Sequence, residues 1–86
     1  MASYSVRIKR SAERELRALS KVDLARIVDH IGGLAANPRP RGSQKLSGEE
    51  KYRIRQGDYR IVYKVGEDEK VVEVIKIGHR REVYRG

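Results

Sequence analysis

Residues 59–65 read YRIVYKV, and their pattern decides the fold. Apolar side chains recur at every second position from Tyr59 to Val65. Because successive side chains of a β-strand point to opposite faces, Tyr59, Ile61, Tyr63 and Val65 would form one continuous apolar face. The pattern predicts a strand that packs this face against helices.

The same period of two is found on both sides of this stretch. Residues 52–55 alternate in the same way, and residues 56–58 between them place a glycine where a tight turn needs one. After a turn at residues 66–69, residues 71–77 are apolar nearly throughout, as is typical of a strand central in a sheet. We predict a hairpin followed by a third strand that ends at Gly78.

The chain before residue 40 has a different pattern. Residues 4–9 alternate like a strand, and Ser11 is expected to cap a short helix. Ser20 is expected to cap a second helix, with Asp23 three residues on as in a capping box. The apolar positions of the two helices are Ala12, Leu16 and Leu19 in the first, and Leu24, Ile27, Val28, Ile31, Leu34 and Ala35 in the second.

A loop separates the helices from the hairpin. Gly32-Gly33 should weaken the last turn of the second helix, and Pro38 lies where that helix cannot continue. Residues 37–43 then form a loop inside one domain. The order β-α-α-β-β-β predicts a single α+β domain over residues 1–86, a two-helix hairpin packed on a mostly antiparallel sheet. The pattern does not determine the strand order.

The composition favours a cytoplasmic protein with a polyanionic partner. The chain has no cysteine, and no apolar run approaches the roughly 20 residues that cross a bilayer. Twenty Lys and Arg against twelve Asp and Glu give a net charge of +8 and a pI near 10.1. Nucleic acid or the ribosome would suit this charge, although a small protein can also be basic for solubility alone.

The predicted hairpin places three arginines on the face opposite the apolar one. Arg53 and Arg55 alternate with the apolar residues of the first strand, and Arg60 joins them from the second. Three guanidinium groups on an open face could bind phosphate oxygens bidentately. The alternative is a solvated face, on which cations keep a sheet soluble and discourage edge pairing.

The C-terminal residues add further reactive groups after the last strand. His79, Arg80 and Tyr84 bring imidazole, guanidinium and phenol together within residues 78–85. Such groups at a strand end are typical of a catalytic site, but an unstructured tail could also end this way, and Tyr84 could cover the core. The other histidine, His30, falls on the polar side of the second helix and is expected at the surface.

The chain resembles the RelE branch of the RelE/ParE toxin superfamily over essentially its whole length. The stretches that carry the resemblance are residues 11–16, 45–48, 59–63 and 78–84. The last two are the more specific when the β-α-α-β-β-β pattern surrounds them. The resemblance implies a toxin of a type II toxin-antitoxin system.

The resemblance further implies a metal-independent endoribonuclease without a cofactor, an mRNA interferase of the ribosomal decoding site. In such an enzyme the 2′-hydroxyl attacks the adjacent phosphate and leaves a 2′,3′-cyclic phosphate and a 5′-hydroxyl. The sequence has no His/Cys/carboxylate cluster at metal-ligand spacing. Glu67, Asp68 and Glu69 fall in a predicted turn and are expected to be solvated.

The resemblance also implies roles for single residues. Arg53 and Arg55 occupy positions where relatives carry lysines, and Arg60 matches the phosphate-binding arginine. Arg80 matches the strand-end arginine and Tyr84 the tyrosine. Other basic residues expected to contact RNA are Lys45, Lys51, Arg81 and Arg85.

Arginine in place of lysine changes the expected chemistry. An arginine is neutral in only about one molecule per million at pH 7, so Arg55 is a poor base, whereas a histidine is mostly neutral and can accept a proton. We therefore predict His79 or Tyr84 for proton transfer. Arg55, Arg60 and Arg80 would hold the scissile phosphate and stabilise the charge that develops on it.

Two other functions remain open for the same fold. One is a ParE-like toxin that poisons DNA gyrase by binding, and the other is a catalytically weak RNA-binding relative. The resemblance implies a RelB-like antitoxin as partner, with a possible higher-order toxin-antitoxin complex, besides ribosome and mRNA. An acidic, amphipathic antitoxin would suit the +8 surface.

Overall fold

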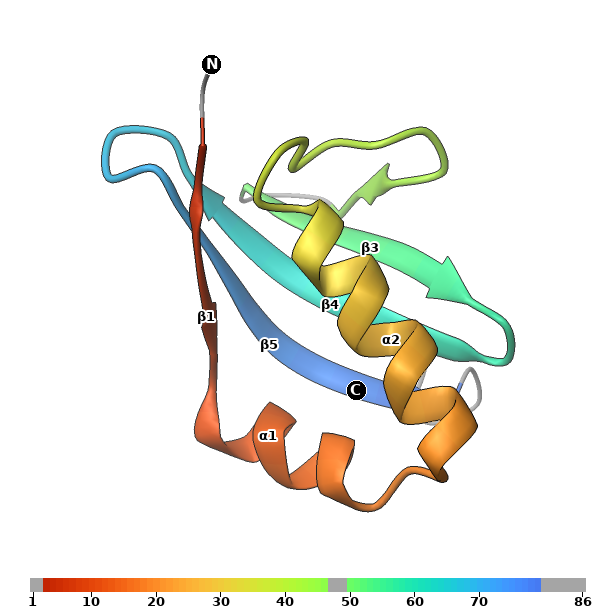
Figure 1. Ribbon diagram of the computed structural model, residues 1–86. Coiled ribbons are helices and arrows are strands. Elements are labelled where there is room, and N and C mark those ends of the chain that lie inside the picture. Colours follow the sequence, from red (N-terminus) through yellow and green to blue (C-terminus); the bar gives the residue numbers. More distant parts are fainter. Residues whose placement is uncertain (1–2, 47–49, 80–86) are drawn as a thin grey trace.

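The computed structural model describes residues 3–46 and 50–79, which form two helices and one five-stranded sheet (Figure 1). In chain order the elements are β1 (Ser5–Ile8), α1 (Arg10–Arg17), α2 (Lys21–Gly33), β2 (Gln44–Lys45), β3 (Lys51–Gln56), β4 (Tyr59–Gly66) and β5 (Val71–His79). The strand order is β1-β5-β4-β3-β2. The predicted α+β class is confirmed, and the structure adds the short strand β2.

The sheet is antiparallel except where β1 pairs in parallel with β5. β1 covers the first half of β5, from Val71 to Val74. Beyond it the register with β4 slips, because Tyr63 pairs with Val74 but Val62 pairs with Lys76. The intervening Ile75 therefore forms a β-bulge. In its second half β5 pairs with β4 along one edge, while its other edge is no longer paired with β1.

β5 continues past Gly78, so the prediction that this glycine ends the strand was wrong. Gly78 pairs with Arg60, and His79 pairs with Tyr59. A glycine weakens a strand but keeps its backbone N–H and C=O, so the ladder with β4 can continue through it. The pairing carries His79 to the end of the sheet at which the β3–β4 turn lies.

The two predicted helix caps have different outcomes. Ser20 is the N-cap of α2 as expected, and its Oγ accepts the Asp23 N–H at 3.3 Å. The prediction for Ser11 was wrong, because α1 begins at Arg10 and Lys9 stands at the N-cap without a side-chain bond. The Lys9 N–H bonds the Val74 carbonyl at 2.9 Å, so pairing with β5 fixes where the chain leaves β1 and enters the helix. Neither helix of the described residues is long and apolar enough to span a membrane.

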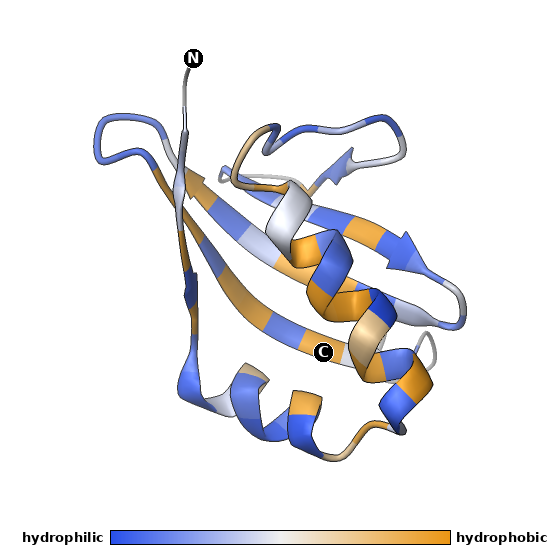
Figure 2. Cartoon of the chain, in the orientation of Figure 1, coloured by the Kyte–Doolittle hydropathy of each residue, from blue (hydrophilic) through white to orange (hydrophobic). Residues whose placement is uncertain are grey.

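The core lies between the helices and one face of the sheet, where apolar segments of both layers face each other (Figure 2). Its largest fully buried side chains are Tyr63, Ile27, Leu34, Ile61, Ile77, Val72 and Val74. Val28 was expected in this core but is 49% exposed. The buried stripe of α2 is narrower than the apolar pattern, since Ile27 and Ile31 already fill the contact with the sheet.

Replacing Ile27 by alanine should lower the free energy of unfolding by about 2–5 kcal/mol, because this side chain is fully buried and would leave a cavity. Val22→Ala is the matched control, since Val22 lies on the same helix and is 60% exposed. Urea unfolding of both variants measures the difference. Equal losses in the two would contradict the assigned core face of α2.

Candidate functional site

The end of the β3–β4 hairpin brings two of the predicted arginines together. Arg55 and Arg60 are register partners across the two strands, next to the turn in which Gly57 has a φ of +60°. This left-handed conformation suits glycine, and it lets the chain reverse immediately after Gln56. The tight turn therefore places two guanidinium groups on one face of the sheet.

Arg60 is buried, which differs from the open position predicted for it. It is 7% exposed, and its Nη1 donates to the Tyr59 carbonyl at 3.1 Å and to the Gly57 carbonyl at 3.4 Å. Val62, on the same face opposite the helices, is also buried, so the burial of β4 is not confined to the face that meets the helices. Arg60 is thus a fixed cation.

The two arginines of β3 differ from Arg60 and from each other. Arg53 is half-buried, and its Nη2 donates to Oε1 of Gln44 on β2. Arg55 is exposed and makes no side-chain hydrogen bond or ion pair with the rest of the described chain. The hairpin end therefore combines the fixed Arg60 with a guanidinium at Arg55 that is available to a ligand.

More charged residues continue this face toward the other end of the sheet. Lys51 of β3 pairs in register with Lys64 of β4, which pairs with Glu73 of β5, which pairs with Arg7 of β1. Register partners share a face, so this row holds three cations and one acid on the side away from the helices. The candidate surface is thus basic along the sheet, with its arginine pair at the turn.

His79 lies on the other face of the same sheet end. It pairs in register with Tyr59, and the two rings meet edge to face with their centroids 5.9 Å apart. Tyr59 packs against the core on the helix side, whereas Arg60 beside it faces the opposite way. The structure therefore does not place His79 on the arginine face, and its catalytic role stays a prediction.

Four of the predicted site residues, Arg80, Arg81, Tyr84 and Arg85, lie outside the described residues. Their roles stay predictions from the sequence. Among the described residues, no group of three or more His, Asp or Glu side chains is arranged to hold a metal ion.

His30 is not the free surface residue that the sequence predicted. It is half-buried, and its Nδ1 lies 2.9 Å from Oε1 of Gln56 at the end of β3. This contact ties α2 to the β3–β4 turn. The alternation of β3 contained the signal for Gln56, because Tyr52, Ile54 and Gln56 share the face that meets the helices.

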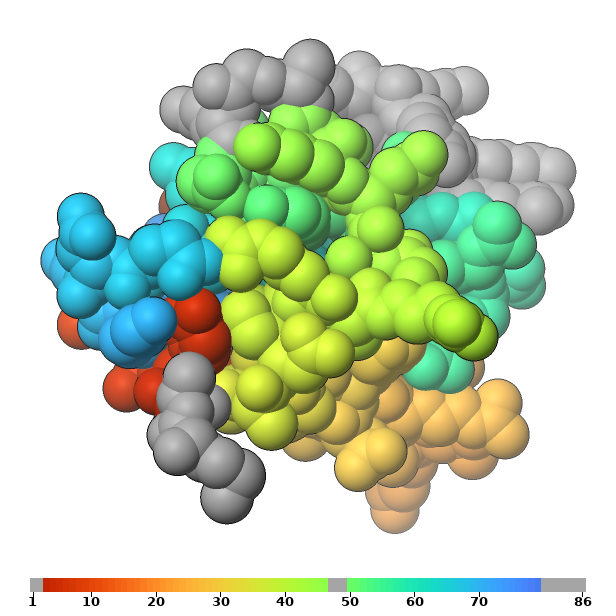
Figure 3. Space-filling model, turned by 90° about the horizontal axis from the view of Figure 1, so that it is seen from above, coloured from red at the N-terminus to blue at the C-terminus, as the bar shows by residue number. Residues whose placement is uncertain are grey.

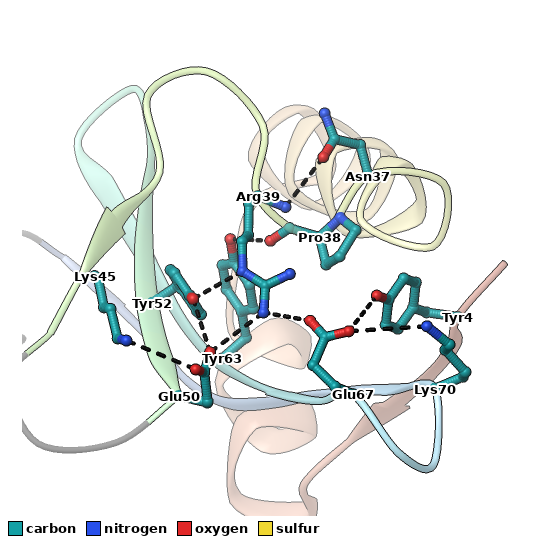
Figure 4. A network of polar contacts seen from close by, with 10 residues as sticks. All are labelled: Tyr4, Asn37, Pro38, Arg39, Lys45, Glu50, Tyr52, Tyr63, Glu67 and Lys70. Atoms are coloured by element: carbon teal, nitrogen blue, oxygen red, sulfur yellow. Dashed lines mark hydrogen bonds and ion pairs between the residues drawn. The ribbon is translucent and has the colours of Figure 1, made fainter. Parts of the chain in front are cut away.

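A polar network at the opposite end of the sheet was missed in the sequence (Figure 4). Arg39 of the 37–43 loop donates to the Tyr52 hydroxyl at 2.8 Å and to Glu50 at 3.2 Å, and it also pairs with Glu67. Its guanidinium carbon lies 5.2 Å from the centre of the Tyr52 ring. Arg39 stands between two prolines in a stretch without periodicity, so no pattern indicated its partners.

The network also holds the first strand and the β4–β5 turn. Glu67 accepts a hydrogen bond from the Tyr4 hydroxyl at 2.8 Å and lies 3.8 Å from Lys70. Glu67 is exposed, as the sequence predicted, but its carboxylate also has these specific partners. Figure 3 shows the loop, the start of β1 and the β4–β5 turn meeting on one face of the molecule. Lys45, predicted to contact RNA, is 58% exposed and lies 3.6 Å from Glu50.

Hydrogen bonds in this network change the acidity of both carboxylates. Tyr52 and Arg39 lower the pKa of Glu50, and Tyr4 and Arg39 lower the pKa of Glu67. Below the network, burial raises the pKa of Tyr63 to about 12, and its hydroxyl donates to the Pro38 carbonyl at 2.7 Å. The loop is thus fixed to the sheet by one neutral and several charged contacts.

The comparisons with known proteins agree on one family. Residues 6–84 match the family model described as the ParE toxin of the type II toxin-antitoxin system parDE. The chain is 30% identical to Toxin RelG of Mycobacterium tuberculosis, over 95% of this chain and 97% of that protein. It is 34% identical to Toxin RelE of the same organism, over 95% of this chain and 87% of that protein.

Solved structures show the same fold. The archaeal RelE-RelB complex from Pyrococcus horikoshii superposes with a TM-score of 0.80 at 30% identity, covering 91% of this chain and 96% of that one. A mutant of the E. coli toxin RelE in the free state gives a TM-score of 0.80 at 28% identity, covering 96% and 92%.

Lowering the pH should weaken the network. The lowered pKa values mean that Glu50 and Glu67 stabilise the fold above their ordinary value of 4.5, and that this stabilisation is lost as the pH falls below it and they take up protons. The urea midpoint of the wild type should therefore fall more between neutral pH and about pH 3 than that of Arg39→Met, which lacks the central cation throughout. Tyr52 and Tyr4 still bond the two carboxylates in this variant, so equal falls would show that Arg39 adds nothing to their stabilising effect in solution.

Proposed function

The chain belongs to the RelE/ParE superfamily of type II toxins, and we propose that it is a RelE-like toxin that cleaves mRNA on the ribosome. The observation that carries this proposal is the pair of Arg55 and Arg60 at the hairpin end, one exposed and one fixed. The basic face beside the pair suits a polyanion, and the net charge is +8.

The geometry of Arg60 suits a phosphate contact. Within the described chain both of its hydrogen bonds use Nη1, and neither Nε nor Nη2 bonds another described residue. A guanidinium group has five donors in a planar fork, so the remaining ones can serve a phosphate oxygen while Nη1 keeps the group in place. Arg55 would approach the same phosphate from β3, and Arg80 would complete the set.

The proposed reaction is an internal transesterification at one phosphate of the message. The 2′-hydroxyl oxygen forms a bond to phosphorus, the bond to the 5′ oxygen breaks, and a 2′,3′-cyclic phosphate and a 5′-hydroxyl result. A base takes the 2′-hydroxyl proton, and an acid supplies a proton to the leaving oxygen. The arginines stabilise the negative charge that develops on the phosphoryl oxygens.

Two residues are candidates for the base. Arg55 remains a poor one, because its guanidinium is charged at neutral pH. His79 could accept the proton if the RNA passes around the end of the sheet, since its ring lies on the helix side beside Tyr59. Tyr84 is the alternative from the sequence.

The proposed partners follow from the family. An antitoxin of the RelB kind is supported by the similar fold in the RelE-RelB complex from P. horikoshii, and an excess of acidic residues in it would suit the basic face. Action on translating ribosomes would place the toxin in the cytoplasm. Toxin and antitoxin could further assemble into a higher-order complex.

A second candidate function is gyrase poisoning by binding. The family model that matches residues 6–84 is the ParE toxin model, and the fold is shared by both kinds of toxin. A binding toxin would need the basic face but not the chemistry at the hairpin end.

The decisive assay uses ribosomes programmed with a defined message. The purified toxin should cut the message during translation, leave 2′,3′-cyclic phosphate ends and spare the same RNA free in solution. Cutting of free RNA would contradict the ribosome-dependent mechanism. No cutting, together with gyrase-linked DNA breaks, would favour the binding toxin.

Substitutions at the hairpin end test the proposed phosphate site. Arg55→Ala should lower the single-turnover cleavage rate by about 10²-fold, because it removes one stabilising charge, and Arg60→Ala and Arg80→Ala should each abolish detectable cleavage. Lys21→Ala is the matched control, since Lys21 is an exposed cation at the start of α2 and does not belong to the basic face of the sheet. It should cleave like the wild type.

Arg55 gives the cleanest result, because its side chain is exposed and its loss does not disturb packing. For Arg60, urea unfolding must show that the variant is folded, since its guanidinium bonds two backbone carbonyls. Retained cleavage in folded Arg55→Ala and Arg60→Ala would remove the proposed site.

A further inference from the structure

Glu15 of α1 is bound to the edge of β5 where β1 no longer pairs. Its Oε1 accepts the backbone N–H of Ile77 at 2.9 Å, and its Oε2 lies 3.3 Å from the Lys76 ammonium group. These contacts join residues more than 60 positions apart in sequence. One carboxylate therefore bonds both the backbone and a side chain of the same strand.

The place of this contact is determined by the topology. β1 ends opposite Val74, and the bulge at Ile75 follows at once. Without a neighbouring strand, the Ile77 N–H would lack an acceptor on this side, and an unpaired buried N–H is costly. The Glu15 carboxylate takes the position that a strand carbonyl would have.

α1 holds Glu15 rigidly in this position. Ala12 and Leu16 of the same helix are buried in the core, three residues before and one residue after it. The helix lies along this part of β5 in Figure 1. Packing of the helix therefore fixes which residue of β5 the Glu15 carboxylate meets and the direction from which it approaches.

The strand segment held by Glu15 leads directly to the candidate site. Gly78 and His79 follow Ile77, and they pair with Arg60 and Tyr59 of β4. A displacement of this edge would change the pairing beside Arg60 and the position from which residue 80 continues. Glu15 can thus affect the arginine pair at the hairpin end through β5, the strand that pairs with β4 beside Arg60.

We propose that Glu15 is a positioning residue, which replaces a missing strand at the edge of β5 and so holds the end of this strand against Arg60. The role rests on the proposed nuclease function. Glu15 does not touch the RNA, and the feature that matters is its acceptor oxygen for Ile77. A glutamine at position 15 has a side-chain amide oxygen at the same distance from the backbone, so it should be able to accept the Ile77 N–H in place of the carboxylate.

Amide hydrogen exchange tests the contact independently of activity. In Glu15→Ala the Ile77 amide should exchange about tenfold faster or more, because it loses a hydrogen bond to a charged acceptor. Glu15→Gln should keep most of the protection. Glu13→Ala is the matched control, since Glu13 lies on the same helix and pairs with Arg17 within it. Unchanged exchange in Glu15→Ala would overturn the proposal.

Single-turnover cleavage on programmed ribosomes tests the consequence. Glu15→Ala should cleave about tenfold more slowly, because the strand end beside Arg60 is then held less precisely, while remaining folded in urea titrations. Glu15→Gln and Glu13→Ala should stay near the wild-type rate. Faster Ile77 exchange with unchanged cleavage would overturn the positioning role.

The two proposals fail in distinguishable ways. If the wild type itself does not cleave programmed ribosomes, the nuclease function fails, and with it the role of Glu15 in cleavage. The exchange experiment then still decides whether Glu15 stands in for a strand. If the wild type cleaves and Glu15→Ala cleaves equally well, the failure belongs to Glu15 alone.

Discussion

The structure depends on β4, which is paired along both edges and buried on both faces for most of its length. β3 and β5 take its two sides, and Arg60, Ile61, Val62 and Tyr63 are all buried within it. A strand in this position must satisfy every polar group that it buries. For Nη1 of Arg60 the strand and its turn do so themselves, through the carbonyls of Tyr59 and Gly57. Arg60 is thus a buried cation that is held by backbone carbonyls of its own hairpin.

The alternation of the strands predicted the faces well, because it depends on backbone geometry alone. Tyr52 and Ile54 are buried, and Arg55 is exposed, as the period of two requires. The same alternation could not predict the burial of Arg60, since it assigns a side chain to a face of the sheet but does not show whether that face is covered. Ser11 failed as a cap for a similar reason: the bond from Lys9 to Val74 of β5 fixes the start of α1, and it joins distant parts of the chain.

The parts of the site that the sequence missed are contacts between elements. His30 looked like a surface residue because its helix face is polar, yet Gln56 meets it from the end of β3. Arg39 lies in a loop without periodicity and finds Glu67 and Tyr52 only after folding. The identity of such partners is set by where chain segments meet in space. Single-residue types and spacing predict the charge of a surface, and tertiary contacts decide which charges remain available.

The two ends of the sheet handle charge in opposite ways. At the end with Arg39, Glu50 and Glu67 each have cations nearby, so the loop and the β4–β5 turn are held by attraction. At the other end Arg55 and Arg60 are directly opposite, and like charges in this position destabilise a strand pair by a few tenths to about 1 kcal/mol. Backbone carbonyls offset part of this at Arg60, but nothing in the described chain offsets it at Arg55. A bound phosphate would relieve the repulsion, so this like-charge pair at the hairpin end is prepared for an anionic ligand.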